Sequence, residues 1–135
     1  MFVIDASITL AWCFADASSE ATDGLLRRLL TEGALAPAHW PMEVGNGLRS
    51  GERRGRIDPA GLSVARSLLT ELPVDLIPID LATALDAVDL ARRHDLSVYD
   101  AVYLGLAASR GLALATADDR LAAACHEAGI ALLAA

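Results

Sequence analysis

Residues 1–7 read MFVIDAS, in which a run of apolar residues is followed directly by an acid. An uninterrupted apolar run of this kind is typical of a strand that is buried on both faces, as in a parallel sheet. Asp5 stands where this strand ends and where the chain enters a helix expected over residues 7–14. In open α/β sheets, ligands bind at the carboxyl ends of the strands. Asp5 is therefore either a turn and capping residue or one member of a site.

Strand and helix patterns alternate along the rest of the chain. Short apolar and β-branched runs predict strands over 34–37, 75–79, 113–116 and 130–133. Periods of 3.6 residues predict a helix capped by Ser18 or Ser19 and further helices over 41–54, 60–72, 81–94, 99–110 and 118–128. Strands separated by helices pair in parallel through right-handed crossovers, so we expect one α/β domain over residues 1–135, with helices on both faces of its sheet.

Two details of this pattern concern individual elements. Pro78 cannot donate to a ladder hydrogen bond, so it favours an edge position for the 75–79 strand. The expected helix 81–94 is indicated by Leu81, Leu85 and Val88, which recur at helical spacing.

Composition excludes several classes of protein. The net charge is −7 and all eleven basic residues are Arg, which argues against non-specific nucleic-acid binding and against P-loop sites, because these need a Lys. Cys13 and Cys125 lack metal-ligand spacing and indicate reduced core thiols. No uncharged run reaches the roughly 18–20 residues of a membrane span, and no basic segment precedes the first apolar residues. We therefore expect a cytoplasmic protein without a membrane partner.

Three further acids stand in apolar surroundings. At helical spacing, Glu43 shares a face with Trp40 and Val44, although Glu is almost never buried unpaired. Asp100 is expected on the same side of its helix as Tyr103. Asp118 follows the 113–116 strand, in the strand–turn–helix context of Asp5.

Each of these acids also has a purely structural explanation. Glu43 either reaches solvent at the edge of its stripe or pairs with an Arg such as Arg49. Asp100 lies three residues after Ser97, which is the spacing of a capping box, and Asp118 is placed to cap the last helix.

The four acids together favour a metal site. If the strand order reverses between the first and fourth strands, Asp5 and Asp118 flank a topological switch point, and the helix-borne Glu43 and Asp100 lean over the same crevice. Four carboxylates this close repel one another unless a cation lies among them. Oxygen ligands without His or Cys suit Mg²⁺ or Mn²⁺, ions that activate water for attack on a phosphodiester.

Four segments carry a resemblance to a known family: VIDAS at 3–7, PMEVGNGL at 41–48, SVYDAVYLGLA at 97–107 and ATADDRL at 115–121. In this order they resemble the signature blocks of PIN-domain proteins, and most of all the VapC toxins of bacterial toxin–antitoxin pairs. The resemblance implies a three-layer α/β/α domain with a five-stranded parallel sheet in the order 3-2-1-4-5. It also implies a Mg²⁺- or Mn²⁺-dependent endoribonuclease that forms a homodimer and is inhibited by a small antitoxin protein.

The resemblance also assigns roles to residues. The metal-binding and catalytic acids of the family match Asp5, Glu43, Asp100 and Asp118, with Asp5 and Asp100 as the principal metal ligands. The polar positions that accompany these acids match Ser7, Asn46 and Thr116, which we expect with Arg49 to bind substrate. A second acid, Asp119, leaves open which of the pair 118–119 belongs to the site.

Some residues and functions stay open at this point. The cluster Arg49–Arg56 either holds RNA phosphates or forms a solvated helix end. The three His residues lack ligand spacing and are expected to be structural or exposed. A competing function is a catalytically inert, dimeric PIN-like module that binds a small partner protein through exposed apolar surface. A phosphatase with Asp5 as nucleophile is disfavoured, because Ser7 stands where such enzymes place a second acid.

Overall fold

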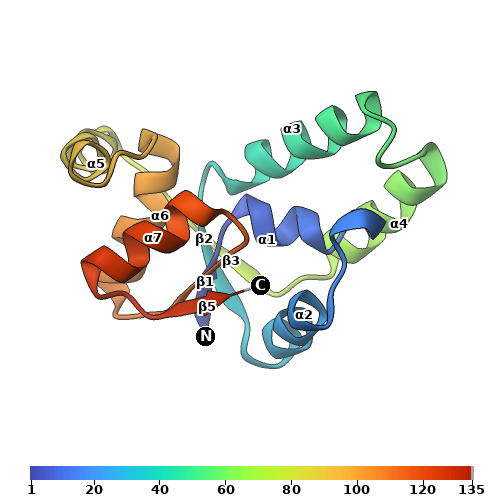
Figure 1. Ribbon diagram of the computed structural model, residues 1–135, viewed down its shortest axis with the longest axis horizontal. Coiled ribbons are helices and arrows are strands. Elements are labelled where there is room, and N and C mark those ends of the chain that lie inside the picture. The colour runs from blue at the N-terminus through green and yellow to red at the C-terminus, as the bar shows by residue number, and fades with distance from the viewer. Residues whose placement is uncertain (135) are drawn as a thin grey trace.

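The computed structural model describes residues 1–134 and consists of a parallel sheet between two layers of helices (Figure 1). The strands are β1 (Phe2–Ile4), β2 (Ala34–Pro37), β3 (Val74–Ile77), β4 (Leu114–Thr116) and β5 (Leu132–Ala134). They lie in the order β3-β2-β1-β4-β5, and every neighbouring pair is parallel. The predicted fold class and strand order are confirmed, as is the edge position of the strand before Pro78.

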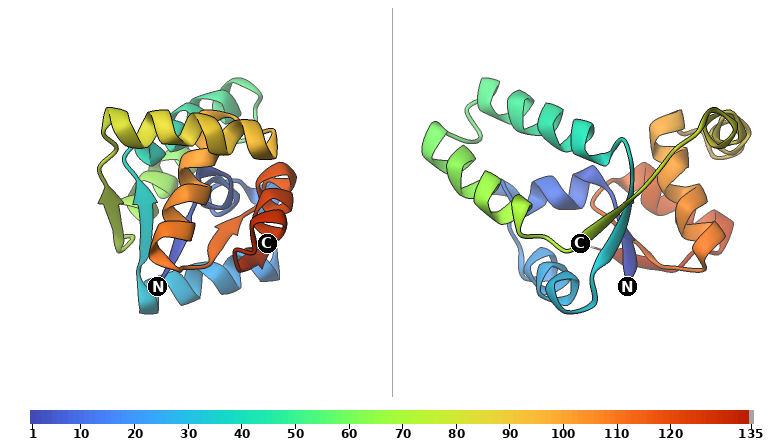
Figure 2. Two further views of the ribbon diagram at one scale, coloured as in Figure 1. Left: turned by 90° about the vertical axis from the view of Figure 1, so that its left-hand side faces the viewer. Right: turned by 180° about the vertical axis from the view of Figure 1, so that it is seen from behind.

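Seven α-helices connect these strands within the described residues. They are α1 (Ala6–Ala11), α2 (Glu20–Glu32), α3 (Trp40–Arg53), α4 (Pro59–Thr70), α5 (Leu81–His94), α6 (Val98–Arg110) and α7 (Asp119–Ala128). Helices α1 to α4 lie on one side of the sheet and α5 to α7 on the other (Figures 1 and 2). The first helix is shorter than expected, because the chain tightens into a 3₁₀ turn, η1 (Ala15–Ala17), after it. No helix in the described part of the chain is long and apolar enough to cross a membrane.

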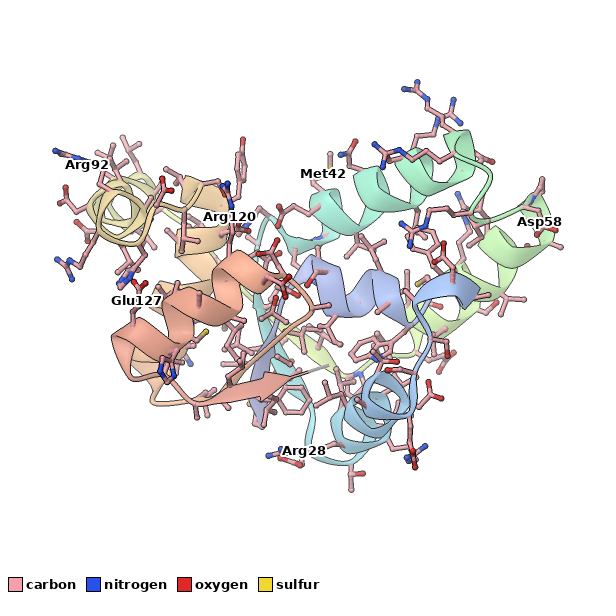
Figure 3. The ribbon with its side chains drawn as sticks, in the orientation of Figure 1. Arg28, Met42, Asp58, Arg92, Arg120 and Glu127 are labelled. Atoms are coloured by element: carbon pink, nitrogen blue, oxygen red, sulfur yellow. The ribbon has the colours of Figure 1, made fainter. Side chains whose placement is uncertain are left out.

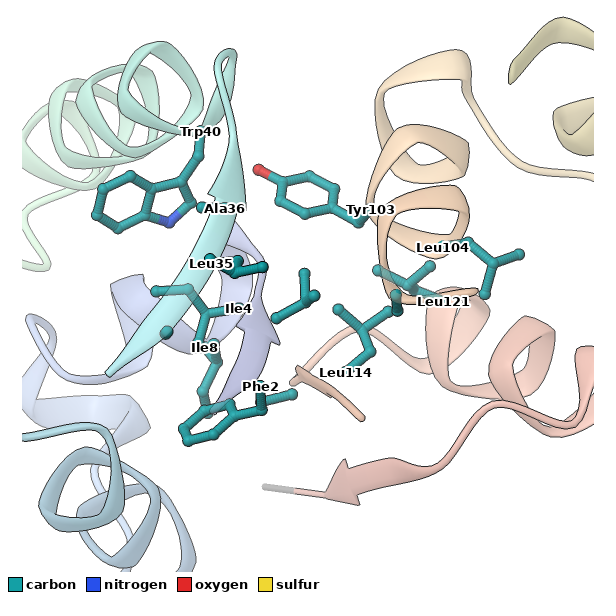
Figure 4. Packing of buried hydrophobic residues seen from close by; sticks show 14 of the residues in the cluster. Phe2, Ile4, Ile8, Leu35, Ala36, Trp40, Tyr103, Leu104, Leu114 and Leu121 are labelled. Carbon is teal, nitrogen blue, oxygen red and sulfur yellow. The ribbon is translucent and has the colours of Figure 1, made fainter. Parts of the chain in front are cut away.

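Strand β1 lies at the centre of the core, as its apolar run predicts. Phe2, Val3 and Ile4 are fully buried, because β2 and β4 flank the strand and helices cover both of its faces. Figure 4 shows Ile8 of α1 on one side of the strand and Leu104 of α6 on the other. A strand enclosed in this way fixes the position of its carboxyl end, where Asp5 follows.

The helix predicted over 81–94 is confirmed as α5, but the apolar residues that indicated it are exposed. Leu81, Leu85 and Val88 are 73%, 58% and 38% exposed, whereas Ala87 and Ala91 are buried against α6. Helix α5 packs across α6 rather than on the sheet, and small side chains allow that close approach. The larger apolar side chains are exposed as a result, and Figure 3 shows Arg92 of the same helix pointing away from the rest of the molecule.

Candidate active site

The four acids predicted from the sequence line one open cleft of about 330 Å³ at the carboxyl ends of β1 and β4. Asp5 follows β1, Asp118 follows β4, Glu43 lies in the first turn of α3 and Asp100 lies in the first turn of α6. The strand order places β1 beside β4, so the crevice lies at the switch point of the sheet. This topology brings together segments that are far apart in the sequence.

Asp5 is the most constrained of the four. Its carboxylate caps α1 by accepting from the backbone N–H of Ile8 at 3.0 Å. The Ser7 hydroxyl donates to the same carboxylate at 2.7 and 2.9 Å, and the Thr116 hydroxyl donates to Oδ2 at 2.5 Å. The residue is only 4% exposed. Asp5 therefore caps a helix and lines the cleft at once, so the two explanations offered by the sequence both apply.

Ser7 and Thr116 join the ends of the two central strands. The Ser7 hydroxyl accepts from the backbone N–H of Ala117 at 2.8 Å, and the Thr116 hydroxyl accepts from that of Asp118 at 3.0 Å. Thr116 is buried beneath Asp5, so its hydroxyl supports that carboxylate. This differs from the substrate contact expected for Thr116, whereas Ser7 lines the cleft itself.

Asp118 rather than its neighbour is the fourth acid of the cleft. Its Oδ1 caps α7 by accepting from the backbone N–H of Leu121 at 2.9 Å, and the residue lines the cleft beside Asp5. Asp119 is exposed in the first turn of α7 and does not line the cleft. Of the two adjacent acids, Asp118 is therefore the one that lies with the other three carboxylates.

Glu43 is held by residues that the sequence did not assign to the site. The hydroxyl of Tyr103 on α6 donates to its Oε1 at 2.6 Å, and Nε2 of His39 lies 3.3 Å from the same oxygen. Figure 4 shows the Tyr103 ring reaching from α6 toward the start of α3. Arg49, which was considered as a partner for Glu43, pairs instead with Glu52 at 2.7 Å and does not line the cleft.

The spacing of residues in the sequence only weakly indicated that His39 and Tyr103 contact the acids of the cleft. His39 precedes Glu43 by four positions and Tyr103 follows Asp100 by three, so each pair shares a helical face. Asn46 is exposed at the cleft on α3, where the sequence placed it.

The acids of the cleft are electrostatically coupled. Burial raises the pKa of Asp5 to about 6, although the hydrogen bonds from Thr116, Ile8 and Ser7 act in the opposite direction. Burial also raises the pKa of Asp100, and the charges of Asp118 and Glu43 raise it further. Within residues 1–134, no Arg lines the cleft, and the basic side chain that contacts one of the four carboxylates is His39, at Glu43.

The donor set fits a hard divalent cation that keeps part of its water shell. All four groups are carboxylates, and burial together with the charges of Asp118 and Glu43 raises the pKa of Asp100. Within the described residues, no three carboxylate, imidazole or thiol groups stand close enough to hold one ion directly. Mg²⁺ is commonly bound through one or two carboxylates plus water and substrate phosphates, rather than in an all-protein cage.

Comparisons with known proteins agree with this architecture. Residues 2–127 match the model of the PIN domain family. Ribonuclease VapC12 of Mycobacterium tuberculosis is 36% identical over 136 residues, which cover 99% of this chain and 100% of that protein. Ribonuclease VapC3 of the same organism is 34% identical over 107 residues, or 79% of this chain and 76% of that protein.

Two solved structures share the fold. PAE2754 from Pyrobaculum aerophilum has a TM-score of 0.71 at 25% identity, covering 98% of this chain and 90% of its own. VapC20 of M. tuberculosis, a sarcin–ricin loop cleaving toxin, has a TM-score of 0.62 at 19% identity, covering 92% of this chain and 95% of its own. With the family match over nearly its whole length, this chain belongs to the PIN domain family, as one of its VapC-type members.

Proposed function

We propose that this protein is a Mg²⁺- or Mn²⁺-dependent endoribonuclease and the toxin of a toxin–antitoxin pair. One observation carries the proposal: among the described residues, four carboxylates from separate segments line a single cleft that no Arg side chain lines. Its relatives VapC3 and VapC12 are ribonucleases by name, which supports RNA as the substrate.

The four acids divide into two pairs by their surroundings. Asp5 and Asp100 are the principal metal ligands, directly or through water, because Ser7 and Thr116 fix the Asp5 carboxylate in one orientation. Glu43 and Asp118 complete the site and position the attacking water. A bound Mg²⁺ or Mn²⁺ supplies a water of lowered pKa and offsets the charge that develops on the phosphodiester. No side chain needs to form a covalent intermediate in this scheme.

Asn46 is the substrate contact that the cleft supports best among the remaining polar residues. It is exposed on α3, one turn beyond Glu43, and it lines the cleft. Its amide both donates and accepts hydrogen bonds, so it suits a ribose hydroxyl or a phosphate oxygen.

The expected partners are a small antitoxin protein and a second copy of the chain. The exposed face of α5 formed by Leu81, Leu85 and Val88 supports a homodimer, because side chains of this size gain stability when a partner covers them. The cytoplasm is the compartment where such a toxin meets both RNA and antitoxin. An inert module that binds a small partner is the second candidate, favoured by the same exposed face.

Metal-dependent cleavage of RNA tests the proposal. Wild-type protein is incubated with RNA in Mg²⁺, in Mn²⁺ and in EDTA, alongside Asp118→Asn and Asp119→Asn as a pair matched in charge. We expect cleavage only with metal, a loss of at least a hundredfold in Asp118→Asn and near wild-type activity in Asp119→Asn. Cleavage in EDTA, or equal activity of the two variants, would contradict the proposal. An inert module would bind a partner protein and cleave nothing.

A further inference from the structure

A second hollow, of about 310 Å³, opens beside the acidic cleft between α1 and α3. The two hollows share Ser7, Leu10, Gly47 and Ser50, so they form one continuous depression. None of the residues that line the second hollow is acidic, whereas Arg54 and Arg56 lie along it. The depression is therefore lined by negatively charged carboxylates at one end and by positively charged guanidinium groups at the other.

Two glycines on α3 bring this helix close to the residues on the other side of the hollow. A Cβ on Gly47 would lie 2.2 Å from Leu10 Cδ1, and a Cβ on Gly51 would lie 2.4 Å from Phe14 Cζ. The backbone of α3 therefore lies directly on the side chains of α1 and of the turn after it. Because a helix rises about 1.5 Å per residue, Arg54 lies roughly 16 Å along the axis from Glu43. An extended strand that starts at the acids and follows α3 reaches Arg54 after a few nucleotides.

The arginines in this region differ in how far their charges are already neutralised. Arg56 is held by two hydrogen bonds to Asp16, at 2.8 and 2.7 Å, and its guanidinium stacks 4.2 Å above the Phe14 ring. Arg49 pairs with Glu52. In the part of the chain that the structure describes, no carboxylate lies within 4 Å of the Arg54 guanidinium. Arg54 is thus the cation of the hollow that is left to bind an anion from outside.

A cation at this position offsets an electrostatic repulsion between the protein and the RNA substrate of the proposed function. The protein has a net charge of −7 and its cleft is lined by four carboxylates, so a phosphodiester is repelled until metal is bound. A positively charged groove that follows the backbone is the usual way in which proteins hold a single strand.

We propose that the hollow between α1 and α3 is a subsite for single-stranded RNA, in which Arg54 contacts a phosphate a few nucleotides from the scissile bond. This inference rests on the proposed ribonuclease function and specifies where the substrate lies.

The neighbouring residue provides a matched control for the test. Arg53 is exposed at the end of α3 with the same charge, has no carboxylate within 4 Å among the described residues and does not line the hollow. The affinity of Arg54→Gln and of Arg53→Gln for a fluorescein-labelled single-stranded RNA is measured by anisotropy in EDTA, over a series of NaCl concentrations. We expect about tenfold weaker binding for Arg54→Gln only, with a salt slope smaller by about 0.7.

Cleavage kinetics with Mn²⁺ supply the second readout. Arg54→Gln should raise KM by a similar factor and leave kcat unchanged, because a remote phosphate contact stabilises ground and transition states equally. Equal RNA affinity of the two variants would overturn the subsite. So would a result in which Arg54→Gln weakens the binding of a protein partner and leaves the binding of RNA unchanged. If the wild type binds RNA through Arg54 without cleaving it, the subsite stands and the proposed nuclease function fails.

Discussion

Asp5 combines three roles that usually fall to different residues. It ends the central strand, caps α1 and presents a carboxylate to the cleft. Capping stabilises the carboxylate through the Ile8 N–H, whereas burial destabilises its charge, and the pKa of about 6 shows that burial prevails. The folded protein therefore carries a charge that costs stability in the absence of a cation.

Asp5→Asn should therefore leave the metal-free protein at least as stable as the wild type. Asn retains an oxygen for the Ile8 N–H and removes both the buried charge and its repulsion from Asp100. At pH 7 we expect a gain of up to about 2 kcal/mol, measured by urea unfolding in EDTA. A loss of several kcal/mol would mean that the charge of Asp5 is structural.

The same carboxylate predicts a pH dependence of stability. The folded pKa of Asp5, about 6, lies above its ordinary value of 3.8, so the folded state binds more protons between these values. The contribution of this group is therefore fully present below about pH 4 and is lost as the pH rises through about 6. Metal-free wild type should lose stability relative to Asp5→Asn across this window. Parallel stability curves for the two proteins in EDTA would contradict the assignment.

Tyr103 and its contact with Glu43 yield a second residue-scale prediction. Tyr103→Phe removes the hydroxyl that donates to Glu43 Oε1 and leaves the buried ring in place. We expect kcat for RNA to fall by about tenfold, while the free energy of unfolding changes by less than about 1.5 kcal/mol. Tyr99→Phe is the control, because Tyr99 is exposed and its hydroxyl has no hydrogen-bond partner within residues 1–134. Equal kcat values for the two variants would exclude a positioning role for Tyr103.

At the scale of elements, the contact of α3 with Phe14, in the turn after α1, depends on a missing side chain. Gly51 is buried, and a Cβ there would collide with the Phe14 ring. Gly51→Ala should lower the free energy of unfolding by about 1–3 kcal/mol, because overpacking outweighs the better helix propensity of Ala. Gly45, on the same helix, has open space around it, so Gly45→Ala should be stabilising by up to about 1 kcal/mol. Urea unfolding that ranks the two variants in the opposite order would contradict this packing.

The elements were largely predictable from the sequence. Alternating strand and helix patterns predicted their order, and capping residues such as Asp118 placed most boundaries to within two residues. Helix α5 shows where pattern reading fails. Its period of 3.6 residues was correct, but Leu85 faces outward, because the partner of the helix is α6 and a small residue, Ala87, forms the contact. Hydrophobic periodicity identifies a helix, but it does not identify the element against which that helix packs.

At the scale of the molecule, the four acids were predictable, because the carboxyl ends of neighbouring parallel strands meet at one edge. The resemblance to PIN domains supplied the strand order that places Asp5 beside Asp118. The contact of Glu43 with Tyr103 was not predictable, because the two residues are 60 positions apart and meet only once α3 and α6 are placed. Side-chain pairs across elements depend on packing that short motifs do not encode.

The exposed apolar face of α5 predicts a dimer that a single charge would disrupt. Leu85→Glu places a carboxylate in the middle of this face, where covering it would cost desolvation. Sedimentation velocity should show a dimer for the wild type and a monomer for Leu85→Glu. Val64→Glu on α4, at another exposed apolar residue, should remain a dimer. A monomeric wild type would contradict a homodimer at any site.

The central claim is that the four carboxylates form a divalent cation site, and binding of Mn²⁺ without RNA tests it most directly. Isothermal titration of the wild type, Asp5→Asn and Asp119→Asn, with melting temperatures at each Mn²⁺ concentration, separates the cleft from the exposed acid beside it. We expect saturable binding and a rising melting temperature for the wild type and Asp119→Asn, and at least tenfold weaker binding for Asp5→Asn. Equal Mn²⁺ affinity in Asp5→Asn, or no binding by the wild type, would contradict the claim.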